Sequence, residues 1–204
     1  MKYILLTLLV FVSLLSNAQF ARGDKFIGGH FSFSTQQSSG GLNDSESKNT
    51  WFELSPSVGF FLNDKFAVGG RVAYSSNRQK NTDDFSTQEY KSHSVSIGAF
   101  VKRYFAISDN FFFLLSGNAN YGRGVQVNES GGSEIKTKGH NIGMYISPSL
   151  LFFPSTKWGI EASIGSLSLS HYRGLSHDSK STSFNVTYGT FSLGFAYYLR
   201  KRPA

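Results

Sequence analysis

The sequence has 204 residues and a formal net charge of +7, with 20 Lys and Arg against 13 Asp and Glu. Charged residues make up 16% of the chain, aromatic residues another 16%, and there is no Cys. A soluble domain carries roughly 25% charged residues, so this composition argues against one. The lack of Cys excludes a disulfide scaffold and a thiolate zinc site.

The first residues have the pattern of an export signal. Lys2 precedes an apolar run over 4–15, and small residues at 16–18 fit a cleavage site. The run is shorter than the roughly 20 apolar residues of a membrane helix, and no later stretch reaches that length. We predict a signal peptide over 1–18 and a single domain over 19–204.

The rest of the chain shows a period of two, with large apolar residues alternating with small or polar ones. This period is typical of β-strands with two unlike faces. Strands are expected at 26–36, 51–62, 66–75, 93–104, 111–122, 141–153, from 158 onward, and 184–199. In the seventh segment the phase changes after Ile164. There Gly165-Ser166 either holds a β-bulge or marks the point where the strand leaves the membrane.

The connections alternate between short and long. Turns such as Asn63-Asp64 are short, whereas polar connections are expected at 37–50, 76–92, 123–140 and 173–183. Short periplasmic turns and long external loops are typical of an outer-membrane barrel, and an even strand number places both termini in the periplasm.

One stretch of the chain is repeated. LSPSVGFFLNDK at 54–65 matches ISPSLLFFPSTK at 146–157. The match indicates either a duplicated hairpin or equivalent demands at two places in a barrel. Pro56 and Pro148 cannot donate to a strand ladder, so each predicts an irregularity.

The chain resembles the small outer-membrane β-barrel family, which includes OmpA-like and OmpX-like domains. The resemblance is carried by these two stretches, by GAFVKRYF at 98–105 and by the aromatic last strand. The resemblance implies an all-β, eight-stranded antiparallel up-and-down transmembrane barrel in the outer membrane of a Gram-negative bacterium. It also implies lipid and lipopolysaccharide as surroundings. Within the last strand, four residues resemble the signal read by the barrel assembly machinery, an expected partner: Ser192, Gly194, Tyr197 and Leu199.

A soluble eight-stranded barrel would have the same period, but it would cover its outside with Lys and Glu. Here the second face is mostly Gly, Ser, Ala and Asn, which would fill a narrow lumen. Aromatic residues such as Phe60 and Trp158 near the turns and Phe52 near the loops predict two interfacial girdles.

Four ionisable residues have inward parity: Glu53, Arg71, Lys102 and Glu161. Two acids and two bases in a narrow interior should pair, because an unpaired buried charge is costly. We predict a plug of salt bridges in which Arg71 and Glu161 are linked across the lumen, directly or through Lys102, Glu53 or a water. A small gated pore is the alternative.

Signals for chemistry are weak. None of the five His has the spacing of a metal site, no cofactor is expected, and no motif for nucleic acid is present. We expect no enzyme, but a scaffold that displays four polar external loops for adhesion or a protein partner. The alternative is a lipid- or peptide-modifying enzyme, whose candidate residues are His30 with Ser32, His93 with Ser94, Asp83-Asp84 and His177-Asp178.

Overall fold

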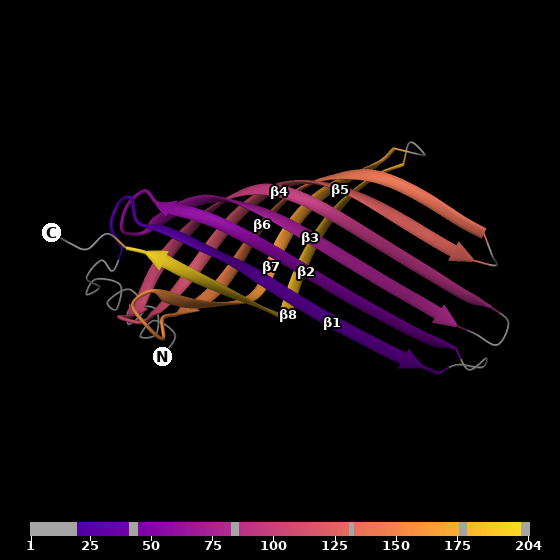
Figure 1. The fold of residues 1–204 in the computed structure, drawn as a ribbon, viewed down its shortest axis with the longest axis horizontal. Coiled ribbons are helices and arrows are strands. Elements are labelled where there is room, and N and C mark those ends of the chain that lie inside the picture. The colour runs from indigo at the N-terminus through magenta and orange to yellow at the C-terminus, as the bar shows by residue number, and fades with distance from the viewer. Residues whose placement is uncertain (1–19, 41–44, 83–85, 131–132, 176–178, 201–204) are drawn as a thin grey trace, which may run out of the picture.

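The computed structural model describes residues 20–40, 45–82, 86–130, 133–175 and 179–200. The strands are β1 (Lys25–Ser39), β2 (Glu46–Phe61), β3 (Phe66–Thr82), β4 (Thr87–Ser108), β5 (Phe111–Ser130), β6 (Ser133–Phe152), β7 (Trp158–Gly174) and β8 (Lys180–Leu199). Consecutive strands are antiparallel, and β1 pairs with β8 to close a barrel (Figure 1). The predicted fold class is confirmed, while the predicted signal peptide lies outside the described residues. No helix in the described residues is long and apolar enough to cross a membrane.

Most of the strands are longer than predicted, mainly at the end away from the termini. β2 begins at Glu46 instead of 51, β4 at Thr87 instead of 93, and β5 continues to Ser130 instead of 122. The expected long polar loops are therefore mostly strand, and this part of the prediction is wrong. Outside the membrane both faces of a strand meet water, so the backbone ladder continues while the apolar alternation ends.

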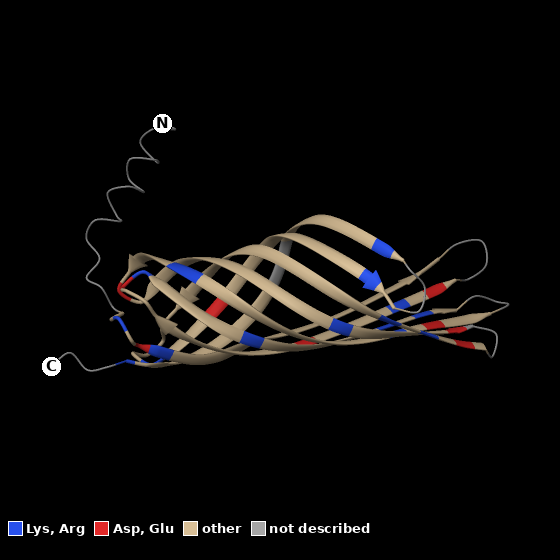
Figure 2. Ribbon diagram, turned by 90° about the horizontal axis from the view of Figure 1, so that it is seen from above, with Lys and Arg blue, Asp and Glu red and all other residues tan. Residues whose placement is uncertain are grey.

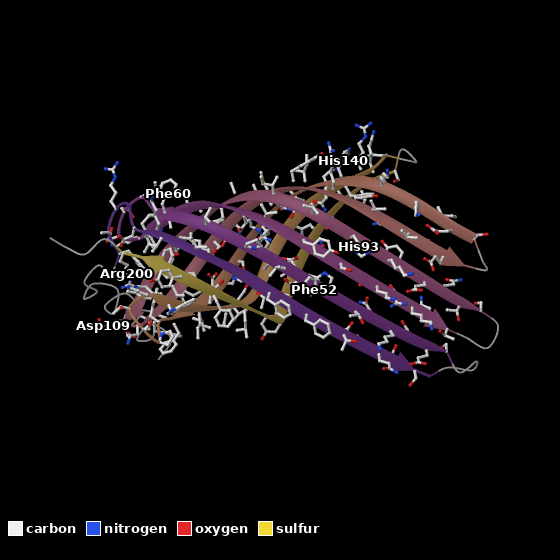
Figure 3. All side chains as sticks on the ribbon, viewed as in Figure 1. Phe52, Phe60, His93, Asp109, His140 and Arg200 are labelled. Atoms are coloured by element: carbon white, nitrogen blue, oxygen red, sulfur yellow. The ribbon has the colours of Figure 1, made fainter. Side chains whose placement is uncertain are left out.

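The outer face of the barrel carries the apolar residues that the period of two assigned to lipid. Ile27, Val58, Ile97 and Met144 are between 57% and 64% exposed on the isolated chain. Large apolar side chains at this exposure on four different strands form a continuous surface fit for hydrocarbon. Figure 3 shows Phe60 toward the end with the termini and Phe52 farther along the same strand. The predicted assignment of the two faces is confirmed for these positions.

Three irregularities interrupt the ladders where the sequence predicts them. The β7–β8 register shifts between Ser163 and Gly165, and Gly165 has a φ of 150°. The register shift confirms the predicted bulge, and the strand continues past it to Gly174. The β6–β7 register shifts around Pro148, and the β2–β3 pairing omits Pro56.

The interior at the end with the termini is filled by large apolar side chains, not by the small residues that were predicted. We call this cluster the aromatic plug; it consists of Phe20, Phe26, Phe61, Phe100, Tyr104, Phe112, Leu114, Leu151, Phe153 and Tyr198. Its members come from every strand of the barrel except β3 and β7, and from the segments just before β1 and just after β6. The prediction failed here because the strand ends carry large residues on both faces, so the alternation that separates the faces is lost.

Phe20 enters the plug from the segment that precedes β1. Its ring stacks on Phe61 with centroids 4.2 Å apart, and the Arg200 guanidinium lies 5.1 Å from its centroid. A turn holds the segment in place, since the Ala21 amide donates to Asp24 Oδ2 at 2.9 Å and the Phe61 amide donates to the Asp24 carbonyl at 2.8 Å. The first described residues thus close one end of the barrel, where Arg200 also lies (Figure 3).

Candidate functional site

Above the aromatic plug the barrel is hollow. The cavity has a volume of about 880 Å³ and extends from Lys102 and Glu161 at its floor to Gln126 near the outer hairpins. Its wall is dominated by serine hydroxyls, and we call it the serine cavity; examples are Ser75, Ser94, Ser96, Ser147, Ser163 and Ser170. Many of these hydroxyls pair across neighbouring strands, as Ser75 with Ser94 at 2.7 Å and Ser147 with Ser163 at 2.7 Å. The interior polarity predicted from the sequence is therefore confirmed for this half.

A buried ion pair forms the floor of the cavity. Lys102 Nζ on β4 donates to Glu161 Oε2 on β7 at 2.5 Å, and both side chains are at most 10% exposed. His30 Nε2 on β1 lies 3.7 Å from the other carboxylate oxygen of Glu161. A Cβ at Gly194 would lie 2.6 Å from His30 Nε2, so the glycine leaves the room that this contact needs. The carboxylate is thus flanked by a cation and an imidazole.

A second ion pair lies on the wall of the cavity. Arg71 Nη2 on β3 is 3.5 Å from Glu53 Oε1 on the neighbouring strand β2. The Arg71 guanidinium also donates to the Tyr145 hydroxyl on β6, and it lies 5.5 Å from the centroid of that ring. Arg71 therefore connects two walls of the barrel.

The four charged residues predicted to share the lumen are all inside, but they form two pairs. Glu53 pairs with Arg71 and Lys102 with Glu161, and no ion pair among the described residues joins Arg71 to Glu161. The direct form of the predicted link is therefore wrong, because strand tilt and shear change the depths at which opposite strands meet. A link through Lys102, Glu53 or a water stays a prediction. Sequence reasoning also missed Tyr145, although its position between Met144 and Ile146 gives it inward parity.

One known protein family matches nearly the whole chain. The model of the outer membrane protein β-barrel domain family matches residues 5–198. The chain belongs to this family. It is therefore an outer-membrane protein, as the lipid-facing surface and the closed ladder require. The comparison with curated proteins found no match.

Solved outer-membrane proteins are similar to this family member. OprG of Pseudomonas aeruginosa is 13% identical, with a TM-score of 0.52 over 91% of this chain and 100% of that chain. Ail, the attachment invasion locus protein of Yersinia pestis, is 18% identical, with a TM-score of 0.42 over 87% of this chain and 99% of that chain. At 13% identity the likeness to OprG concerns the barrel fold alone.

The residues predicted as an assembly signal lie on β8 of this outer-membrane barrel. Gly194 is buried inside, whereas Leu199 is on the outer face and Tyr197 packs edge-on against Trp158 with ring centroids 5.2 Å apart. Ser192 lines the serine cavity. Recognition by the assembly machinery stays a prediction, and Gly194 has a second role in admitting His30.

The candidate catalytic residues of the barrel are not arranged as a dyad in the described residues. His93 faces outward, with Nδ1 3.1 Å from the Tyr74 hydroxyl, whereas the neighbouring Ser94 faces the cavity. His30 does have an acid neighbour, which the sequence did not reveal, but no hydrogen bond joins it to a serine in the described part of the chain. Asp83-Asp84 and His177-Asp178 lie outside the described residues. No cluster of three metal-binding side chains occurs within the described ranges of the chain.

Proposed function

We propose that this outer-membrane barrel is a non-enzymatic scaffold that presents a polar β-sheet outside the cell for adhesion or for a protein partner. The observation that carries the proposal is the pairing of β1 to β6 up to their tips. Ser39 pairs with Glu46, Glu46 with Thr82, and Thr82 with Thr87. The pairing continues to the tip of the β5–β6 hairpin. Three hairpins therefore join into one projecting sheet (Figure 1).

Polar contacts hold this projecting sheet together. Gln37 donates to Glu46 at 2.6 Å on one hairpin, and Ser47 donates to Asn81 at 2.8 Å between two hairpins. Charged residues crowd on the same outer segments (Figure 2). A paired sheet loses less conformational entropy on binding than free loops do, which favours its use as a recognition surface.

An ion-pair cluster joins the second and third hairpins of the sheet. Arg78 pairs with Glu89, and Lys91 Nζ lies 3.4 Å from Glu89 and 3.1 Å from Glu129. The hydrogen bond from Arg78 and the charge of Lys91 lower the pKa of Glu89. Because these charges are already paired with one another, a partner should recognise the shape of the sheet. Attraction of any oppositely charged molecule should matter less.

The interior favours the scaffold over its alternatives. The aromatic plug closes the barrel below the serine cavity, which speaks against a permanent pore. The cavity's carboxylates are engaged by Lys102 and Arg71, which speaks against a free general base. The projecting sheet is then the candidate binding surface.

Site-specific cross-linking on intact cells tests the proposal. A photo-reactive phenylalanine analogue is placed at Gln88, near the tip of the projecting sheet, and as a control at Thr182 on the shorter β7–β8 hairpin. We expect a discrete protein adduct from Gln88 that is absent from Thr182. The same adducts from both sites, or none from Gln88 and other tip positions of the sheet, would contradict the scaffold.

A further inference from the structure

A row of basic side chains crosses the outer face of β5, β6, β7 and β8. Arg123, His140, Arg173 and Lys180 are register partners in this order on the four neighbouring strands. They share the parity of the lipid-facing residues on these strands, so their side chains stand on the outside, where both arginines and the lysine are exposed. Neighbouring strands are about 4.8 Å apart, which makes this basic row about 14 Å long.

The basic row lies where the apolar surface ends. Four residues closer to the membrane centre, the row across the same strands is Ala119, Met144, Leu169 and Phe184. Two residues closer, it is Tyr121, Ile142, His171 and Thr182. The surface thus changes from apolar to amphipathic to cationic over about 14 Å of strand. This is the order from acyl chains through the interface to charged headgroups.

A chain of hydrogen bonds orients two members of the row. Arg123 Nε donates to the Tyr121 hydroxyl at 3.1 Å, and this hydroxyl is 2.9 Å from Nδ1 of His140. When Tyr121 accepts from Arg123 and donates to His140, the imidazole carries its proton on Nε2. The remaining guanidinium nitrogens and Nε2–H are then donors for an anion.

We propose that the basic row binds the phosphate groups of outer-leaflet lipid, such as the diphosphorylated glycolipid of lipopolysaccharide. Guanidinium groups pair with phosphate in a bidentate geometry, and a lysine adds a point charge. The acids described on the outer face of β5 and β6 lie farther out: Glu129 pairs with Lys91 and Glu134 with Lys136. The proposal concerns the lipid around the barrel and does not depend on what the projecting sheet binds.

The other half of the barrel offers an internal comparison. On β4, β3 and β2 the same row continues as Val95, Tyr74 and Leu54, with no cation. Tyr74 and His93 there repeat the stacked tyrosine–histidine pair of Tyr121 and His140, with ring centroids 6.3 Å and 5.9 Å apart. Both halves therefore have the tyrosine–histidine pair, but in this row only the β5–β8 half carries arginine and lysine side chains. Phosphate binding should be one-sided.

Native mass spectrometry of the full chain in neutral nanodiscs tests the proposal, with diphosphorylated lipid A as the added probe and its dephosphorylated form in parallel. The test variant is Arg173→Gln with Lys180→Gln. The matched control is Lys48→Gln with Lys80→Gln, which removes the same charge from exposed register partners on β2 and β3. A third variant combines Arg123→Gln with the two substitutions of the test variant.

The test variant should bind the phosphorylated probe roughly 25-fold more weakly, since each of its two lost basic residues contributes about fivefold at an anionic surface. The control should change little, and the dephosphorylated probe should bind both variants alike. Equal weakening in test and control variants, or unchanged retention of the phosphorylated probe by the variant with all three substitutions, would overturn the proposal. All the substituted residues are exposed, so folding should persist, and unchanged circular dichroism would verify this.

Discussion

The aromatic plug and the serine cavity occupy the same barrel interior and are built from the same strands, yet their chemistry is opposite. On β5, Phe112 and Leu114 belong to the plug, whereas Ser116 and Asn118, with the same parity, line the cavity. The change occurs within one step of two residues. The inner face of a small barrel is therefore not one environment: one end is packed like the core of a soluble protein, and the other is polar and hollow.

The difference separates two tasks. The plug supplies apolar burial that a lipid-facing surface cannot, and each fully buried large apolar side chain contributes about 1.5–3 kcal/mol. The cavity supplies no such burial, but it holds the charges that connect opposite walls, such as Lys102 and Glu161. Stability should therefore respond to apolar truncation at one end and to charge imbalance at the boundary.

The largest effect is expected in the plug, from Phe61→Ala. Phe61 is 1% exposed and contacts Phe20, Phe26, Tyr104 and Tyr198. Its truncation should lower the free energy of unfolding by about 3–5 kcal/mol, because the cavity left among rigid strands cannot collapse. Urea unfolding in lipid vesicles measures this loss.

Phe60→Ala is the matched control, since Phe60 is the neighbouring residue and 46% exposed on the outer face. Lipid can fill the space left by the outward ring, so the loss should be clearly smaller. If both truncations cost the same, the plug is no better packed than the lipid-facing surface.

At the boundary of the two regions, Glu161→Gln should cost about 3 kcal/mol, because it leaves the buried Lys102 charge without its partner. A double-mutant cycle with Lys102→Met should give a coupling energy of about 1–3 kcal/mol. The same cycle between Glu161 and Arg71 should give a value near zero, since these residues belong to separate ion pairs. Strong coupling of Arg71 to Glu161 would instead support a single network across the lumen.

Arginine substitutions at neighbouring positions of β4 compare the cavity with the lipid surface. Ile97 is 64% exposed on the outer face, and Ser96 lines the cavity. Ile97→Arg should cost about 2 kcal/mol or more near the membrane centre, whereas Ser96→Arg should be tolerated better because the cavity is polar. Unfolding in vesicles of one lipid composition provides the measurement, and a reversed order would mean that inside and outside are exchanged.

The smallest effect is expected where the hollow half continues into the projecting sheet. The hydrogen bond from Arg78 lowers the pKa of Glu89 below its ordinary value of 4.5. A lowered carboxyl pKa stabilises the fold above the ordinary value, and the gain is lost as the pH falls through the lowered one. Carboxyl NMR titration should find this lowered pKa in the native chain and a return toward 4.5 in Arg78→Gln. If the pKa of Glu89 is the same in Arg78→Gln as in the native chain, the pair of Arg78 and Glu89 does not stabilise the sheet.

The lipid-facing surface and the bulge could be predicted from the sequence. Residues such as Ile97 keep the period of two, and Gly165 lies where this period is interrupted. The plug could not be predicted in this way. The run at 111–115 is apolar at every position, so parity cannot tell Phe112 from Phe113, and Phe20 lies in a segment with no period at all. Tyr198 has the same parity as the small residues Gly194 and Ala196, yet it is one of the most buried side chains. Inward parity identified the four lumen charges, but their partners depend on tilt and shear, which no local pattern encodes.

Cysteine accessibility tests the division of the interior most directly, because the chain contains no Cys of its own. Single Cys residues are introduced at Ala67, which is 0% exposed in the plug half, and at Ser94 in the wall of the cavity. Each variant, in vesicles of known orientation, is treated from either side with a charged thiol reagent. We predict rapid modification of Ser94→Cys from the outer side and none of Ala67→Cys from either side. Modification of Ala67→Cys from the side of the termini, at a rate near that of Ser94→Cys, would contradict a closed plug.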